Sequence, residues 1–403
     1  RKAPCSGTLQ SNHVGIVDCH QHLVFDGNGT PVAPEGISKR GFQRWRDTTD
    51  RIAGDIKGDL GFMNVETVVT DRNDLPRDLK GQSGPFNFRT HPEGIAHLLL
   101  TGFNVFSLAN NHSMDYGEPG LKETLRHVGE LKGSGLKAAA GLGMNREEAS
   151  RPQVIDVKGA KVGFAAIGIV TNNLAHHRAG ERQPGQIAYR FDDDFALIRK
   201  RLKETRADFR ILSIHYGTEG QVRTDARQIK EWRNEAARED SIDIIVGHHA
   251  HVVRGVEITG KSLIFYGLGN FLHHGTADIT GKGVCRDYGL MARVYMKRGE
   301  DGRFAIGAVQ AIPVTDTHYR PRRFTRTEGE KRIHALNYLA ATLDSADGAK
   351  GLRLTPQGDG TGLYCSETGR RSSGALGQLP AGYKPAPPVP PAYSQQIAAS
   401  CSR

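Results

Sequence analysis

The sequence predicts an α/β fold, a layered αββα sandwich in which two mixed sheets are flanked by helices, with an extended C-terminal tail. Short β-branched runs such as residues 242–246 are typical of buried strands, and amphipathic segments such as residues 228–238 alternate with them. A hairpin pattern over residues 154–169 indicates a second sheet. At 403 residues, with 37% hydrophobic and 24% charged residues, the chain can bury a substantial core.

The other elements follow the same strand–helix rhythm, and no internal repeat interrupts it. Strands are predicted at residues 60–67, 102–109, 209–214 and 262–267, with a closing hairpin at 290–297 and 304–314. Helices are predicted at residues 42–53, 91–100, 118–132, 195–205 and 328–343. The expected organisation is a main domain over 13–320, a helical extension over 321–347 and a Gly/Ser/Pro-rich tail over 348–403 that runs as an extended or wrapped arm.

Polar clusters follow several predicted strands. The apolar run at 102–109 opens onto Asn110, Asn111 and His112, with Asp115 three residues further on. Burying an amide beside an imidazole is costly unless each finds a partner, so the cluster indicates a metal, a ligand or water at this strand end. The alternative is that these are ordinary turn residues, because Asn tolerates left-handed backbone.

A second strand, at residues 242–246, leads into a histidine-rich segment containing His248, His249 and His251. On an extended backbone, the alternate residues His249 and His251 project to one face, where two imidazoles reach one metal or two neighbouring metals. A solvated histidine-rich turn is the alternative.

Three more predicted strand ends carry polar residues. Asp18 and His20 alternate at the end of a first strand predicted within residues 13–25, Asn64 and Glu66 alternate at the end of the strand at 60–67, and His215 follows the strand at 209–214. Alternation places each pair on one face of its strand. The alternative to a ligand role is that Asp18 is an ordinary turn carboxylate and that Glu66 is a structural carboxylate.

Four of these motifs resemble a known family. They are Asn110-Asn111-His112-x-x-Asp115, Ile214-His215-Tyr216-Gly217-x-Glu219, Gly247-His248-His249-x-His251 and Tyr266-x-Leu268-Gly269-Asn270-Phe271. Together they resemble the CapA (PgsA-like) family of capsular poly-γ-glutamate synthesis proteins over roughly residues 18–275, and that family is similar in fold to the calcineurin-like metallophosphatases. At 64–66 the chain follows the family's Asn-x-Glu form, whereas the phosphatases have a bridging Asp.

The resemblance implies a site with two divalent metal ions, and the donor types suit Mn, Fe or Zn. The predicted metal ligands are Asp18, His20, Glu66, Asn111, His215, His249 and His251. His112 is the expected general acid, oriented by Asp115, and the predicted substrate-binding residues are Tyr216, Glu219 and Asn270.

Two functions follow from this resemblance. The first is a metal-dependent hydrolase of a phosphoester or related anionic bond, linked to capsular poly-γ-glutamate or cell-surface polymer metabolism. The alternative is a non-catalytic accessory protein that binds poly-γ-glutamate or another polyanion during assembly and export. Membrane-bound polymer synthesis proteins are the partners that this context allows.

Charge and cysteine content bound the remaining possibilities. The 54 Lys and Arg against 44 Asp and Glu give a net charge of +10, which favours an anionic polymer or phosphoester; without a Lys/Arg run, nucleic acid is disfavoured. Five scattered cysteines form no CxxC motif, and their odd number leaves at least one unpaired.

The longest apolar run, residues 162–170, is too short to span a bilayer, so any anchor is expected before Arg1. The family points to export or the cell envelope; a cytoplasmic location stays open.

Overall fold

The computed structural model describes residues 45–81, 85–170, 172–273, 279–299, 304–366 and 390–401. Outside these ranges it describes only the backbone of strands β1 (Val24–Phe25) and β2 (Pro31–Val32), which pair antiparallel. The predicted ligands Asp18 and His20, and the cysteines Cys5 and Cys19, lie outside the described residues.

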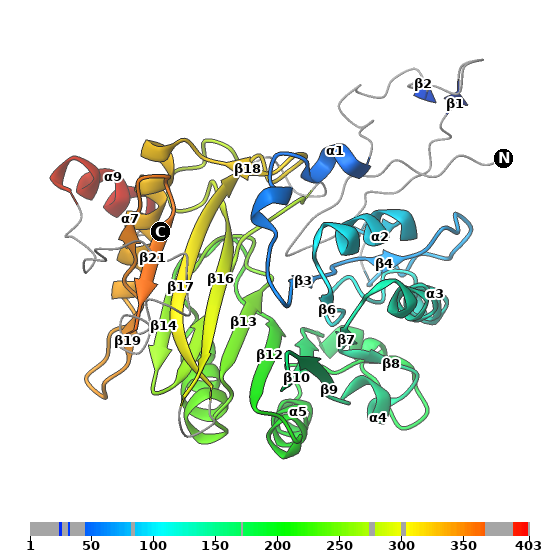
Figure 1. The fold of residues 1–403 in the computed structure, drawn as a ribbon. Coiled ribbons are helices and arrows are strands. Elements are labelled where there is room, and N and C mark those ends of the chain that lie inside the picture. Colours follow the sequence, from blue (N-terminus) through cyan, green and yellow to red (C-terminus); the bar gives the residue numbers. More distant parts are fainter. Residues whose placement is uncertain are drawn as a thin grey trace.

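A seven-stranded mixed sheet forms one layer of the molecule (Figure 1). In spatial order its strands are β19 (Lys350–Gly351), β14 (Val256–Thr259), β15 (Ser262–Phe265), β13 (Ile244–His248), β12 (Phe209–His215), β10 (Ala160–Gly168) and β9 (Gln153–Val157). The four strands β15, β13, β12 and β10 are parallel to their neighbours in this run, so their carboxyl ends meet at one edge.

Two smaller sheets make up the second layer. One is parallel and contains β3 (Phe62–Asn64), β6 (Val105–Ser107) and β7 (Ala138–Ala140). The other is antiparallel and contains β16 (Gly289–Arg298), β17 (Phe304–Thr315), β21 (Gly362–Cys365), β20 (Thr355–Pro356) and β18 (Arg322–Arg323). Two short pairs flank them, β4 (Val68–Val69) with β5 (Arg89–Thr90) and β8 (Leu142–Gly143) with β11 (Gly185–Gln186).

Side-chain alternation explains how the layers pack. In β10, Phe164 and Ala166 belong to the core between the sheets, whereas Ala165 and Ile167 pack on the opposite face. Helix α5 (Asp192–Glu204) and the π-helical η5 (Ile229–Glu239) cover that opposite face. Helices α2 (Pro92–Thr101) and α3 (Gly117–Leu131) cover the outer face of the second layer. The predicted αββα layering is therefore confirmed.

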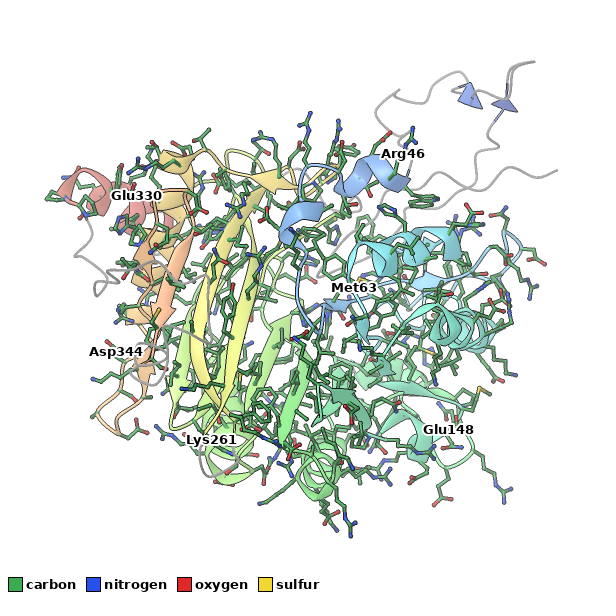
Figure 2. The ribbon with its side chains drawn as sticks, viewed as in Figure 1. Arg46, Met63, Glu148, Lys261, Glu330 and Asp344 are labelled. Carbon is green, nitrogen blue, oxygen red and sulfur yellow. A yellow bond between two sulfur atoms is a disulfide. The ribbon has the colours of Figure 1, made fainter. Side chains whose placement is uncertain are left out.

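The centre of this sandwich is densely filled. Met63 on β3 is completely buried, and Figure 2 shows it deep among side chains, while Glu330 and Asp344 lie at the periphery. Trp232 on η5 is also completely buried and stacks on Tyr266, with ring centroids 5.7 Å apart. Burying side chains of this size supplies much of the free energy that holds the outer helices to the sheet.

The predicted helix at 42–53 is shorter than expected. Within the described chain it consists of α1 (Trp45–Thr49) followed by the single 3-10 turn η2 (Ala53–Asp55). The β-branched Thr48 and Thr49, and Gly54 beyond them, are poor helix formers. The remaining helices are η3 (Lys132–Ser134), α4 (Arg146–Ala149), η4 (Asn172–His177), α6 (Ala226–Gln228), α7 (Arg326–Ala341) and α9 (Pro391–Cys401).

Part of the predicted tail is folded into the sandwich. Strand β19 pairs with β14, and β21 pairs with β17, so residues 350–365 join both layers. The reason is that Leu352, Leu354 and Leu363 supply apolar side chains, each buried, which the Gly-rich composition obscured. Residues 350–365 therefore run as an arm wrapped onto the domain, one of the two courses predicted for the tail.

A disulfide joins helix α9 to the folded domain. Cys401 at the end of α9 is bonded to Cys285, 116 residues earlier, and Cys365 on β21 is buried. Disulfides of this kind persist mainly in oxidising compartments. Within the described ranges, every helix is too short or too polar to cross a bilayer.

Candidate metal centre

The carboxyl ends of β3, β6, β12 and β13 bring the predicted ligands together. Glu66 lies two residues beyond β3, Asn111 lies beyond β6, His215 ends β12, and His249 directly follows β13. Parallel pairing of β3 with β6 and of β12 with β13 aligns these ends along one edge of each layer. The candidate ligands within the described ranges therefore lie beside the carboxyl ends of strands, as predicted.

Three of these residues form a compact cluster. Glu66, His215 and His249 each offer a ligand atom, and these atoms all lie within 4.8 Å of one another. Nε2 of His215 lies 3.4 Å from Oε1 of Glu66, and the His215 and His249 ring centroids are 4.9 Å apart. Glu66 and His215 are completely buried, so the cluster is held by packing as well as by the backbone.

His249 and His251 reach the cluster differently from the sequence prediction. Strand β13 ends at His248, and His249 and His251 have φ values of 86° and 57°, so the expected extended backbone is wrong here. Left-handed backbone costs a non-glycine residue about 1–3 kcal/mol and is concentrated at functional sites. The two rings nevertheless lie near each other, with centroids 6.3 Å apart.

Amide side chains orient the imidazoles. Oδ1 of Asn111 lies 2.7 Å from Nε2 of His215, and Nδ2 of Asn64 lies 3.3 Å from Nδ1 of the same ring. Oδ1 of Asn270 lies 3.0 Å from Nδ1 of His251 and accepts its hydrogen, which leaves Nε2 as the lone-pair nitrogen. Such contacts fix ring orientation around metals.

The residues present fit a divalent metal. Burial and the neighbouring histidines hold the pKa of His215 and of His249 well below the usual range, so both imidazoles are neutral, the form that binds metals. Nδ1 of His249 is buried and has no hydrogen-bond partner among the described residues. One carboxylate with imidazoles and an amide, without thiolate, suits Mn, Fe or Zn.

His112 and Asp115 lie directly beside this cluster. Nδ1 of His112 is 2.8 Å from Oδ2 of Asp115, and Nε2 of His112 is 4.0 Å from Oε1 of Glu66. Asp115 is completely buried and also accepts a hydrogen bond from the Phe88 amide at 2.5 Å. His112 thus lies between Asp115 and the candidate ligand Glu66.

A buried lysine, Lys80, completes this group. Its Nζ lies 2.5 Å from Oδ1 of Asp115 and 3.4 Å from Nδ1 of His112. Burial lowers the pKa of His112; Asp115 opposes the shift and the Lys80 ammonium adds to it. A neutral His112 keeps its hydrogen on Nδ1, toward Asp115, and Nε2 can accept one. An anionic substrate near Nε2 would favour the doubly protonated form that acts as an acid.

The predicted substrate-binding residues occupy different surroundings. Glu219 is exposed, and its Oε1 lies 3.7 Å from Nε2 of His249 on the open side of the cluster. Asn270 is buried against His251. Tyr216 packs against Tyr189, with ring centroids 4.6 Å apart, in the core beneath the outer helices. Of the three, only Glu219 combines exposure with contact to a candidate ligand.

Sequence reasoning missed two residues of the site. Lys80 stands alone in a loop with no motif around it, so no pattern marks it. His273 is buried, and its ring centroid lies 4.8 Å from that of His251. It follows Asn270 by three residues, so extending that motif would have found it.

A second carboxylate–imidazole cluster lies near Lys80. Oδ2 of Asp78 is 2.5 Å from Nε2 of His177 and 3.0 Å from Nε2 of His176, and Oδ1 of Asp78 accepts from the Lys80 amide at 2.7 Å. Burial raises the pKa of Asp78, but the hydrogen bonds with His177 and His176 outweigh it and hold the pKa at about 2. We call Asp78, His176 and His177 the rim cluster.

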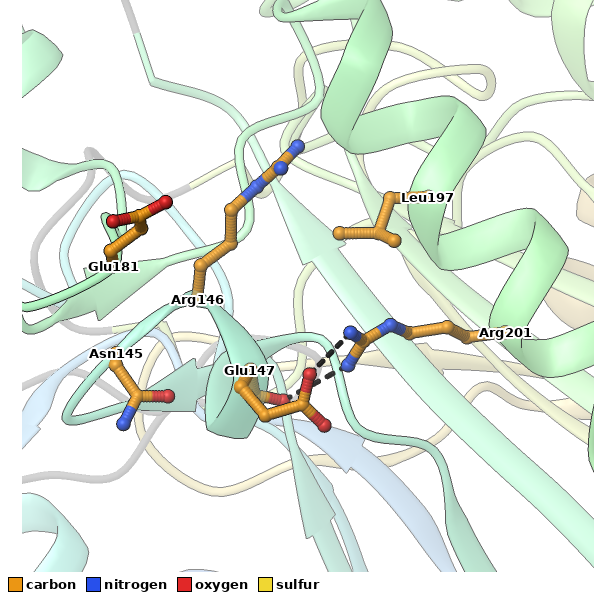
Figure 3. A pocket seen from close by; sticks show the side chains of 6 residues that line it. All are labelled: Asn145, Arg146, Glu147, Glu181, Leu197 and Arg201. Carbon is orange, nitrogen blue, oxygen red and sulfur yellow. Dashed lines mark hydrogen bonds and ion pairs between the residues drawn. The ribbon is translucent and has the colours of Figure 1, made fainter.

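A hollow in the described surface lies elsewhere. It measures about 360 Å³ and is lined by residues around α4 and α5, among them Arg146, Glu147 and Arg201 (Figure 3). Arg201 is paired with Glu147, and Arg146 with Asp193 and Asp194. Because its cations already have carboxylate partners and none of the predicted site residues lines it, this hollow is no candidate active site.

These features define an αββα protein with a buried carboxylate–imidazole centre at its strand ends. The family described as bacterial capsule synthesis protein PGA_cap matches residues 34–274. This match covers more than half of the chain, and the protein belongs to that family. The resemblance inferred from the four motifs is therefore confirmed.

Two relatives carry capsule-related names. The chain is 34% identical over 182 residues to the capsule biosynthesis protein CapA of Bacillus anthracis, covering 45% of this chain and 42% of that protein. It is 29% identical over 252 residues to the PGA biosynthesis protein CapA of Bacillus subtilis, covering 62% of this chain and 61% of that protein. The match therefore spans less than two thirds of either relative.

Among solved structures, a 5'-nucleotidase precursor from Thermus thermophilus resembles the chain weakly. The TM-score is 0.32 at 14% sequence identity, with 83% of this chain and 59% of that chain covered. This likeness is too weak to indicate an activity.

Proposed function

We propose that the protein is a metal-dependent hydrolase that acts on a phosphoester or a related anionic bond in cell-surface polymer metabolism. The observation that carries this proposal is the convergence of Glu66, His215 and His249 beside the hydrogen-bonded pair His112 and Asp115. A protein that only grips a polyanion needs cations and open surface, whereas this site combines buried donors with a proton-transfer pair.

The chain's residues divide the work. Glu66, Asn111, His215, His249 and His251 would hold divalent metal, which when bound supplies Lewis acidity toward a phosphoryl or carbonyl oxygen.

Asp115 would stabilise the doubly protonated ring of His112, which would donate its Nε2 proton to the leaving oxygen and remain as the neutral ring with its hydrogen on Nδ1. Lys80 fixes the Asp115 carboxylate from its other oxygen and so limits rotation of the pair. Exposed Glu219 marks the side from which substrate would enter.

The second candidate function is an accessory role in polyglutamate assembly. It is favoured by the names of the relatives, which refer to capsule and PGA biosynthesis, and by the net charge of +10. In this role the same centre would bind side-chain carboxylates of the polymer without cleaving it. Binding of poly-γ-glutamate that weakens with salt would accompany this role, because exposed charges are screened over about 8–10 Å near physiological ionic strength.

The test is the variant His112→Ala. If His112 is the acid, turnover of an aryl phosphate in the presence of Mn should fall about 10²- to 10⁴-fold, the usual contribution of a positioned acid or base. Metal content should stay nearly unchanged, because the predicted ligands are untouched.

The matched control is His97→Ala. His97 pairs with the Thr49 hydroxyl at 2.8 Å and contacts none of the site residues, so turnover should be retained. Loss of metal from His112→Ala would assign His112 as a ligand instead. Absence of hydrolysis by the unmodified protein on every phosphoester and polyglutamate substrate, together with salt-sensitive polymer binding, would favour the accessory role.

A further inference from the structure

The rim cluster joins two parts of the chain that are far apart in sequence. Asp78 lies in the segment between β4 and β5, and His176 and His177 are almost 100 residues later in η4. One carboxylate oxygen, Oδ2 of Asp78, faces Nε2 of both rings, at 2.5 Å from His177 and 3.0 Å from His176. The three ligand atoms therefore lie within 4.8 Å of one another.

Exposure within the rim cluster is graded. The side chains of His177, Asp78 and His176 are 2%, 16% and 58% exposed, respectively. Two donors are thus fixed by packing, while the third borders solvent. A metal bound by two imidazoles and one carboxylate on such a border keeps coordination positions open for water or another ligand.

The carboxylate of the rim cluster faces imidazoles and a backbone amide. The Asp78 carboxylate contacts His176, His177 and the Lys80 amide. By contrast, His127 lies near Asp71 and Glu123, but Nη2 of Arg126 already lies 2.8 Å from its Nε2 and 2.9 Å from Oε2 of Glu123. A guanidinium at that position competes with a metal, so that group is an ordinary ion-pair network.

We propose that Asp78, His176 and His177 form a separate divalent transition-metal site of the zinc class, outside the centre built on Glu66, His215 and His249. The metal replaces the hydrogens that Nε2 of the two imidazoles would otherwise direct at Oδ2 of Asp78. Backbone and side-chain contacts support the carboxylate: Oδ1 accepts from the Lys80 amide, and the Asp78 amide donates to the Asp115 carbonyl at 2.8 Å.

Metal in the rim cluster would fasten the segment carrying Lys80 to η4. Asp78 and Lys80 are two residues apart, and Lys80 contacts Asp115 and His112. The rim site is therefore a clamp beside the proton-transfer pair, and it rests on its own ligands, independently of the proposed hydrolase activity.

The experiment uses Co²⁺ as an optical probe and as the counted metal. His176→Ala is the principal variant because its side chain is more than half exposed, so the fold should tolerate the change. Relative to the unmodified protein, His176→Ala should lose about one equivalent of tightly bound Co²⁺ and the corresponding visible absorption bands. Asp78→Asn should lose the same bands, because an amide is a weaker ligand than a carboxylate.

Two further variants separate this site from the buried centre. His215→Ala should lose metal from the buried centre and keep the bands of the rim cluster, so failure of one site is distinguishable from failure of the other. His97→Ala, which removes a histidine from neither site, should bind as the unmodified protein does. Equal Co²⁺ stoichiometry and identical spectra for the unmodified protein and His176→Ala would overturn the proposal.

Discussion

The buried centre and the rim cluster use the same donors in different frameworks. Each offers one carboxylate and two imidazoles whose ligand atoms lie within 4.8 Å of one another. In the buried centre, Glu66 and His215 are completely buried beside strand ends, whereas His176 in the rim cluster is 58% exposed and lies in a 3-10 helix.

This difference separates two kinds of metal site. Strands that pair over several residues fix the donors of the buried centre before any metal arrives, so the site is preorganised. A loop and a short 3-10 helix fix the rim cluster less firmly, and a metal there would contribute to joining the two segments. The buried centre is therefore suited to a catalytic metal, and the rim cluster to a metal that joins two segments of the chain.

The largest expected effect tests the buried centre. His215→Ala should lower its metal affinity at least about 100-fold, because removing a ligand should exceed the about 10- to 100-fold cost of removing an outer partner. Hydrolysis should disappear with the metal, and elemental analysis should count the loss. If the variant kept both its metal content and its turnover, His215 would not be a ligand of the buried centre.

The buried centre could be predicted because strand ends leave a pattern in sequence. Apolar runs followed by Asn111, His215 and His249 place donors at one edge once the strands are parallel, whatever the lengths of the connections. The αββα layering follows from the same runs and from the amphipathic helices between them. The same apolar runs therefore predict both the sheets and the edge at which the donor residues lie, because the strands are parallel.

The rest of the site left no comparable pattern. Lys80 and Asp78 lie in a loop whose path depends on tertiary packing, and His177 approaches from almost 100 residues away. The left-handed turn at His249 was also unpredicted, because His rarely adopts φ above zero without tertiary support. Long-range contacts of loops are decided by packing that composition and periodicity do not encode.

A smaller effect is expected at Lys80, the residue that connects the two regions. Lys80→Met removes the cation 2.5 Å from Oδ1 of Asp115 while keeping much of the side-chain volume. Turnover should fall about 10- to 100-fold, as for other orienting partners, with metal content unchanged. Lys80→Arg is the matched control and should restore part of the rate by supplying a cation. If Lys80→Met turned over at the normal rate, the pair His112 and Asp115 would need no third partner.

The smallest expected effect is on the pH dependence of the free energy of unfolding, measured on metal-free protein. The buried centre and the rim cluster should respond over different ranges of pH. Burial holds the pKa of His215 and of His249 well below 6.5, so below that pH the unfolded chain binds more protons than the folded one, and the free energy of unfolding falls.

Asp78 responds at lower pH. Its folded pKa of about 2 lies below the usual 3.8, so its contribution is fully present above about pH 4 and is lost as the pH falls toward 2. Asp78→Asn should therefore be less stable than the unmodified protein by on the order of 1 kcal/mol from pH 7 to about 4, a value discounted for its partial exposure. That difference in the free energy of unfolding should close at lower pH, whereas the free energy of unfolding of both proteins should fall together between pH 7 and 5.

Denaturant unfolding at several pH values measures both trends. A difference that stays open down to pH 2 would mean that Asp78 does not stabilise the fold through its ionised carboxylate.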